Sequence, residues 1–284
     1  MIDEHEIPTG SRLYFGKSAK LKRDIEAKAS ELLEDAGFDE IVTPFFSYHQ
    51  HKSLNEKEII RFSDRQNNLV SLRADSTLDV VRLMTKRLGR STKQNKWFYI
   101  QPVFRYPSLE VNQIGAEFIG NSDLSSSIGL CGEVFKKFNL LPLVHISNIK
   151  IPKMIADELG LDLSVFERAE LQKILSLDID WLEKLACLQN PEDIDSVIEV
   201  VPQNIKKELE KMKSLYEKLE YKNVYFSPLY YVNMRYYDEL FFRFIEKNST
   251  LAKGGSYKSE GIESTGFGLY TDALIETIIR NENG

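Results

Sequence analysis

The two strand-like runs on either side of Tyr106-Pro107-Ser108 constrain the fold of this chain more than any other feature. The chain reads KWFYIQPVFR before this turn and LEVNQIGAEFIG after it, and both runs are rich in residues that favour strands. Successive side chains of a strand point to opposite faces, so Gln113, Gly115 and Glu117 share one face of the second run. We therefore predict an antiparallel hairpin over residues 97–120 with polar groups on one face.

That polar face needs partners, because a buried carboxylate is costly unless it is paired or hydrogen-bonded. Gly115 has no side chain, which would leave a hollow between Gln113 and Glu117 or let another group approach the backbone. One hypothesis is a pocket for a ligand with an ammonium group and an imidazole. The alternative is that Arg105 and Glu117 pair with each other across an exposed sheet. The candidate binding residues on this face and on neighbouring predicted strand ends are Asp75, Thr77, Arg105, Gln113, Glu117, Tyr236, Tyr237 and Tyr257.

The spacing of apolar residues predicts the helices and strands that precede the hairpin. Residues 16–36 carry apolar side chains at helical intervals and predict an amphipathic helix that ends at Gly37. Residues 38–48 predict a strand closed by Pro44. A strand near residue 70 precedes a helix from about Ser76, with Asp75 or Ser76 as its N-cap.

The pattern after the hairpin changes twice. Residues 123–138 predict a helix and 142–150 a strand, and residues 152–219 then show almost only helical spacing. Strand patterns return over 223–232 and 239–247, before a glycine-rich turn and a final helix. Strand signals flanked by helices favour an α+β domain.

Composition narrows the functional classes. The net charge of −6 disfavours a nucleic-acid-binding protein, since such proteins usually carry a basic excess. No apolar run is as long as a membrane span, and the N-terminus has no secretory signal, which predicts a cytoplasmic protein. Cys131 and Cys187 form no metal-binding pattern, and we interpret His49 and His51 as part of a solvated loop. We expect no metal and no cofactor.

Several stretches together resemble class II aminoacyl-tRNA synthetases. GFDEIVTPFFSY is similar to their motif 1, FRYPSLEVNQIGAEFIG to motif 2 and GFGLYTDAL to motif 3. SLRADST, VNMRYYDELFF and KGGSY resemble the histidyl-tRNA synthetase segments LRPE/DxT, RGLxYYxGxxFE and GGRYD. The resemblance spans residues 10–276. It implies one synthetase-like domain over 1–284, with a mostly helical insertion at about 152–219 and no anticodon-binding domain.

The chain departs from these motifs mainly at positions where the synthetases have positively charged side chains. The motif 3 arginine falls on Ala273 and the arginine of RGLxYY on Val232, while Ser256 and Lys258 replace residues of GGRYD. The motif 2 loop is also shorter. Adenylation needs positive charge at the reacting phosphate, so the resemblance implies no catalytic residues and negligible synthesis.

The residues that match histidine contacts of the family are retained. The resemblance implies that Asp75, Thr77 and Gln113 hold the α-amino group and that Glu117, Tyr237 and Tyr257 face the imidazole. Tyr236 lies in the same signature, and Arg105 would meet the carboxylate or another anion.

A synthetase-like chain without catalysis resembles the regulatory subunits of ATP phosphoribosyltransferase. This resemblance implies a non-catalytic subunit that binds free histidine and regulates a short-form catalytic subunit in histidine biosynthesis. It also implies a homodimer through the motif 1 region, about residues 17–48. Two alternatives stay open, which are a residual enzyme that adenylates a carboxylate and an accessory binding module with another partner.

Overall fold

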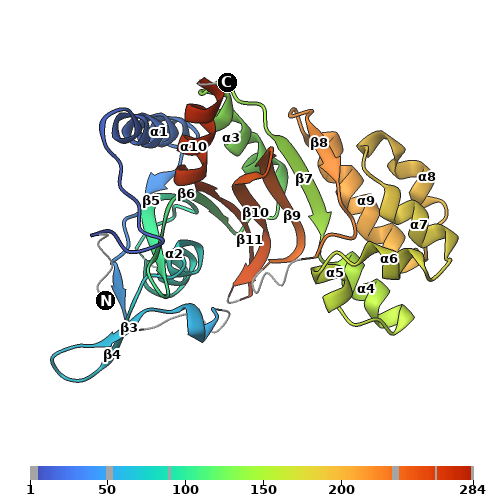
Figure 1. The fold of residues 1–284 in the computed structure, drawn as a ribbon, viewed down its shortest axis with the longest axis horizontal. Coiled ribbons are helices and arrows are strands. Elements are labelled where there is room, and N and C mark those ends of the chain that lie inside the picture. The colour runs from blue at the N-terminus through green and yellow to red at the C-terminus, as the bar shows by residue number, and fades with distance from the viewer. Residues whose placement is uncertain (1–5, 49–53, 89–90, 232–236, 260, 283–284) are drawn as a thin grey trace. The chain divides into compact units, whose positions relative to one another are not determined.

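The computed structural model describes residues 6–48, 54–88, 91–231, 237–259 and 261–282. It divides into two compact units, residues 1–120 with 266–284 and residues 121–265 (Figure 1). Each unit combines strands with flanking helices, so the predicted α+β class is confirmed. No helix of the described ranges is both long and apolar enough to cross a membrane.

The predicted hairpin forms the centre of the first unit. Strand β5 (Lys96–Arg105) pairs antiparallel with β6 (Leu109–Ile119), and the short β1 (Asp39–Glu40) pairs parallel with β5. The last five residues of β11 (Ile262–Tyr270) belong to this unit and lie next to β6 in the strand order β1-β5-β6-β11.

Three helices flank these strands. α1 (Gly16–Asp35) and α10 (Thr271–Glu282) lie side by side in Figure 1, and α1 buries the apolar stripe predicted for it. α2 (Ser76–Leu83), which continues as a π-helical turn (Met84–Leu88), packs Val80 and Met84 against Trp97 and Tyr99 of β5. The side chain of Asp75 caps α2, as predicted.

The strand predicted over 38–48 is wrong as a single element. It splits into β1 and β2 (Phe46–Ser47), and β2 joins a small sheet of order β2-β4-β3. The chain leaves β5 because the Thr43 N–H bonds to the Gln101 side chain and Pro44 has no N–H to donate. The other members are β4 (Leu69–Leu72) and β3 (Arg61–Ser63), which follows a short helix η1 (Glu56–Glu58).

Arg73 secures this break from inside the first unit. Its side chain is fully buried and donates to the carbonyl of Pro102 from Nε and Nη2, at 2.9 and 2.7 Å. Nη1 donates to the carbonyl of Thr43 at 2.7 Å, and the guanidinium carbon lies 4.9 Å from the centre of the Phe45 ring. Burial lowers the pKa of Arg73 to about 10, which leaves the side chain charged at neutral pH.

The strands of the second unit follow the order β11-β10-β9-β7-β8. β9 (Tyr237–Glu246) is antiparallel to both β10 (Ser249–Ser259) and β7 (Leu143–Asn148), and β8 (Val224–Phe226) is parallel to β7. The glycine-rich turn predicted after residue 252 is therefore wrong, since this segment forms β10 and β11. Gly255 makes room for an aromatic neighbour, because a Cβ there would lie 2.6 Å from the Tyr237 ring.

Helices make up most of the remaining second unit. α3 (Leu124–Lys136) precedes β7, and the predicted helical stretch from 152 to 219 is confirmed. In Figure 1 these later helices gather beside β7 and β8. They are α4 (Lys150–Leu159), α5 (Ser164–Glu167), α6 (Leu171–Leu175), α7 (Asp180–Cys187), η3 (Pro191–Asp193), α8 (Ile194–Ile198) and α9 (Gln203–Lys218).

Candidate functional site

The N-terminus of α2 positions two of the predicted residues. Asp75 Oδ1 accepts the N–H of Leu78 at 2.9 Å, which is the usual geometry of an N-cap. Burial raises the pKa of Asp75 to about 6, although the Leu78 N–H and the positive charge of Arg105 oppose the rise. Thr77 is buried in the first turn of the helix, and its hydroxyl contacts the Tyr99 hydroxyl of β5.

Tyr99 connects this helix end to the polar face of β6. Its hydroxyl lies 3.0 Å from Oγ1 of Thr77 and donates to Oε1 of Glu117 at 3.4 Å. Glu117 is fully buried and cannot bond to bulk water. The Tyr99 hydroxyl supplies one of the hydrogen bonds that its carboxylate needs. The Tyr99 hydroxyl thus contacts both Thr77 and Glu117.

The expected hollow over Gly115 is wrong. Tyr99 is directly opposite Gly115 in the register of the hairpin, and a Cβ on Gly115 would lie 2.2 Å from the Tyr99 hydroxyl. The glycine thus makes room for a tyrosine of the neighbouring strand. Gly266 has a comparable role on β11, since a Cβ there would lie 2.0 Å from Oε2 of Glu117.

Arg105 does not pair with Glu117, so the alternative of a simple cross-strand ion pair is wrong. Arg105 is opposite Leu109 at the turn, whereas Glu117 is opposite Trp97 at the other end of the hairpin. Nη1 of Arg105 instead lies 3.6 Å from Oε2 of Glu58 in a solvent-exposed pair.

Arg105 nevertheless stays close enough to two half-buried groups to change their titration. Its positive charge lowers the pKa of Asp75 and that of Tyr270, and burial outweighs it in both, raising the pKa of Tyr270 to about 12. Asp75, Arg105 and Tyr270 therefore form a second electrostatic cluster in the first unit.

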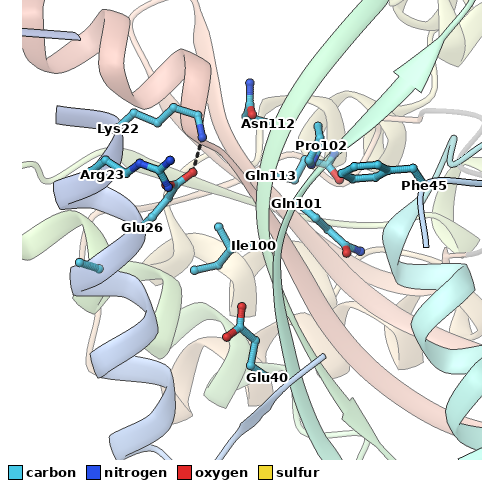
Figure 2. A pocket seen from close by; sticks show the side chains of 11 residues that line it. Lys22, Arg23, Glu26, Glu40, Phe45, Ile100, Gln101, Pro102, Asn112 and Gln113 are labelled. Carbon is cyan, nitrogen blue, oxygen red and sulfur yellow. Dashed lines mark hydrogen bonds and ion pairs between the residues drawn. The ribbon is translucent and has the colours of Figure 1, made fainter. Parts of the chain in front are cut away.

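Gln113 faces a cavity of about 670 Å³ that Figure 2 shows between α1 and the hairpin. Gln101 is directly opposite Gln113, and its own amide is bonded to Thr43 and to Ser76. Charged side chains of α1 form the other wall, where Lys22 and Glu26 make an ion pair. The lining residues are Lys22, Arg23, Glu26, Ala27, Glu40, Phe45, Ile100, Gln101, Pro102, Asn112 and Gln113.

The predicted tyrosines belong to the second unit. Tyr237 and Tyr257 are buried and directly opposite each other in β9 and β10, with ring centres 6.3 Å apart. Tyr236, like Val232 and the His49–His51 loop, lies outside the described residues. Convergence of all eight candidates on one ligand stays a prediction.

The sequence reasoning missed Tyr99, Gln101 and Tyr270. Tyr99 and Gln101 were detectable, because counting the hairpin register from its turn places them opposite Gly115 and Gln113. In the part of the chain that the structure describes, no group of three or more His, Cys, Asp or Glu side chains is arranged to hold a metal.

Comparison of the chain with known proteins shows which family it belongs to. The family model for histidyl-tRNA synthetase matches residues 14–274. The ATP phosphoribosyltransferase regulatory subunit of Wolinella succinogenes is 48% identical over 285 aligned residues, which cover 100% of this chain and 99% of that protein. The chain belongs to the histidyl-tRNA synthetase family, among the ATP phosphoribosyltransferase regulatory subunits.

Solved structures of this family share the fold. An ATP phosphoribosyltransferase regulatory subunit/histidyl-tRNA synthetase from Bacillus halodurans superposes with a TM-score of 0.85 at 23% identity, over 97% of this chain and 83% of that one. A chain of the ATP phosphoribosyl transferase (HisG:HisZ) complex from Thermotoga maritima has a TM-score of 0.70 at 21% identity, over 88% of this chain and 97% of its own length. The predicted class II synthetase-like fold is confirmed.

Two of the described departures from the synthetase motifs of the family have clear local surroundings. Ala273 lies in the first turn of α10, next to Asp272, which accepts the backbone N–H and the side-chain amide of Asn112, both at 3.0 Å. Lys258 is exposed, and its Nζ lies 4.0 Å from Oε1 of Glu263. At two of the positions where this regulatory subunit departs from the synthetase motifs, it therefore has an alanine and a surface lysine.

Proposed function

We propose that this regulatory subunit binds free histidine and passes the binding free energy to an ATP phosphoribosyltransferase catalytic subunit. The observation that carries the proposal is the contact of one hydroxyl, that of Tyr99, with both Thr77 and Glu117. This contact ties the N-terminus of α2 to a buried carboxylate at the far end of the hairpin. A ligand that contacts both Thr77 and Glu117 would therefore act on the α2 N-terminus and on the hairpin together.

The assignment of roles follows the chemistry of each group. Asp75, Thr77 and Gln113 offer oxygen acceptors to an α-ammonium group, and Arg105 offers a cation to the ligand carboxylate. Glu117 would accept a hydrogen bond from the imidazole, with Tyr236, Tyr237 and Tyr257 completing its surroundings. Coupling between a ligand site and a partner is typically about 1–3 kcal/mol, which suffices for feedback regulation.

We propose a cytoplasmic homodimer formed through the motif 1 region, about residues 17–48. Apolar side chains of this region are unusually exposed, with Val42 at 74%, Phe45 at 50% and Phe46 at 60%. Exposed apolar patches of this kind mark interaction surfaces, and Phe45 also borders the cavity of Figure 2. A second copy of the chain is the occupant that would cover them.

Calorimetric titration of histidine into the intact chain tests the ligand. We expect saturable binding that weakens at least about tenfold in Glu117→Gln, because a hydrogen bond to a charged group is lost. Glu208→Gln is the matched control, since Glu208 is also buried but bonds to Asn148 and Lys211. Absent histidine binding, or equal affinity in Glu117→Gln, would contradict the proposed site.

Co-purification with a short-form catalytic subunit tests the partner. Wild type and Glu117→Gln should both retain the catalytic subunit, and only wild type should change its phosphoribosyltransferase rate when histidine is added. A chain that binds histidine but never retains the catalytic subunit would contradict the regulatory role and leave the ligand site intact.

A further inference from the structure

Four strands of the second unit place one residue each in a row across their shared face. Lys253 of β10 is directly opposite Arg243 of β9, which is opposite His145 of β7, which is opposite Tyr225 of β8. Directly opposed residues of neighbouring strands point to the same face, so two cations, an imidazole and a phenol adjoin one another. None of these residues belongs to the proposed histidine site.

Arg243 is the centre of this row, and its partners are neutral. Nη1 donates to the Tyr230 hydroxyl at 2.7 Å, Nη2 donates to Nδ1 of His145 at 3.1 Å, and the guanidinium lies 3.7 Å from the centre of the Tyr230 ring. Nε is buried and has no hydrogen-bond partner among the described residues. No carboxylate of the described residues pairs with Arg243, so its half-buried charge is left without a counter-charge.

His145 adds a directed donor beside this charge. A guanidinium has only donors, so Nδ1 of His145 must accept, and the ring proton is on Nε2. Burial and the positive charge of Arg243 lower the pKa of His145 to about 4, which keeps the ring neutral at physiological pH. Its ring stacks on Tyr225 with centres 4.8 Å apart, so its orientation is held.

Space for a ligand adjoins the row. Tyr225 and Tyr230 also line a cavity of about 200 Å³, whose other walls include apolar side chains of α5, α6 and α7. Arg243, His145 and Tyr225 are all partly accessible to solvent. The histidyl-tRNA synthetase signature RGLxYYxGxxFE, aligned on its two tyrosines, ends in glutamate where this chain has Arg243. The charge at this position is therefore reversed relative to that signature.

We propose that Arg243, His145 and Lys253 form a binding site for an oxyanion, the phosphate or carboxylate group of a small ligand. The guanidinium supplies charge and a planar pair of donors, His145 supplies Nε2–H, and the opposing lysine adds a second positive charge. An oxyanion would supply the counter-charge that Arg243 lacks among the described residues. The site is independent of the proposed histidine pocket.

Anion titrations of the intact chain test the proposal. Inorganic phosphate and acetate are added separately at constant ionic strength against chloride, and the ring signals of His145 are followed by NMR. The chain has only four histidines, and His145→Gln assigns the signal. We expect one of the two anions to give a saturable shift in the millimolar range, and which one does so identifies a phosphate or a carboxylate ligand.

Substitution separates this site from general charge attraction. Arg243→Gln should weaken anion binding at least about tenfold, whereas Lys136→Gln, which removes an exposed lysine paired with Glu133, should leave it unchanged. If Arg243→Gln does not fold, Arg243→Lys replaces it in the test. This variant keeps the charge but loses the planar donors, and it should also weaken anion binding. Glu117→Gln should bind the anion normally. No saturable shift with either anion, or equal shifts in the Arg243 variants, would overturn the proposal.

Discussion

The hydroxyl of Tyr99 occupies the space directly over Gly115, where a Cβ would come within 2.2 Å of it. The same hydroxyl contacts Thr77 and Glu117, so one side chain of β5 fills the hollow expected in β6 and links two candidate histidine-binding residues. The surroundings of Thr77 and Glu117 therefore depend on the register of the hairpin, which places Tyr99 opposite Gly115.

Removal of this hydroxyl is the most direct test of the linkage. Tyr99→Phe should lower the free energy of unfolding by about 1–2 kcal/mol, because Thr77 and the buried Glu117 each lose a hydrogen-bond partner. Denaturant unfolding measures the change. Tyr225→Phe is a suitable control, since Tyr225 is only partly buried, and we expect a change within about 0.5 kcal/mol. Equal effects in the two variants would mean that the Tyr99 hydroxyl has no special role.

The raised pKa of Asp75 predicts a pH dependence with a defined sign. Its folded pKa of about 6 exceeds the usual aspartate value of 3.8, so the folded state binds the proton more tightly than the unfolded state. The stabilisation from this group is thus complete below pH 4 and is lost as the pH rises toward 6. Because Asp75 is partly exposed, we expect a loss of about 1–2 kcal/mol in wild type that Asp75→Asn does not show.

The same group predicts a pH dependence of ligand affinity. An α-ammonium group is held better by an ionised Asp75, so histidine affinity should rise as the pH passes through about 6. The titration of histidine's own imidazole contributes equally in Asp75→Asn, and the difference between the two proteins isolates Asp75. Parallel pH profiles for wild type and Asp75→Asn would exclude Asp75 as an ammonium ligand.

The buried Arg73 should be one of the most sensitive positions for stability. Arg73→Met removes the hydrogen bonds to the carbonyls of Pro102 and Thr43, and we expect a loss of about 3 kcal/mol or more in the free energy of unfolding. Arg65→Met, at an exposed arginine of the same unit, should change it by less than about 0.5 kcal/mol. A similar small effect at both positions would show that Arg73 does not secure the motif 1 segment.

The proposed homodimer predicts a specific surface. Phe46→Glu should convert a dimer to a monomer in light scattering, because a charge would be buried between two apolar faces. Leu171→Glu, at a similarly exposed leucine of α6 in the second unit, should leave the mass unchanged. A dimer that survives Phe46→Glu would place the interface elsewhere.

Local rules were sufficient for several elements. Alternation of side chains predicted the 97–120 hairpin and placed Gln113 and Glu117 on one face. The N-cap preference predicted Asp75 or Ser76 at the start of α2, and Asp75 is the cap. The spacing of apolar residues predicted α1 and the helices after residue 150. These features depend on residues within a few positions of one another, so the amino-acid order alone contains them.

Other features depended on contacts between distant segments. The strand predicted over 38–48 is broken because Arg73 and Gln101, far along the chain, bind Thr43 and its neighbours. The glycine-rich segment around Gly255 was interpreted as a turn, but Gly255 lies in β10 and makes room for the Tyr237 ring of β9. The register of the paired strands decides which side chains are neighbours, such as Tyr99 and Gly115 or Arg243 and His145. Register follows from packing of the whole unit, which is why tertiary structure decided the surroundings of Tyr99 and Arg243.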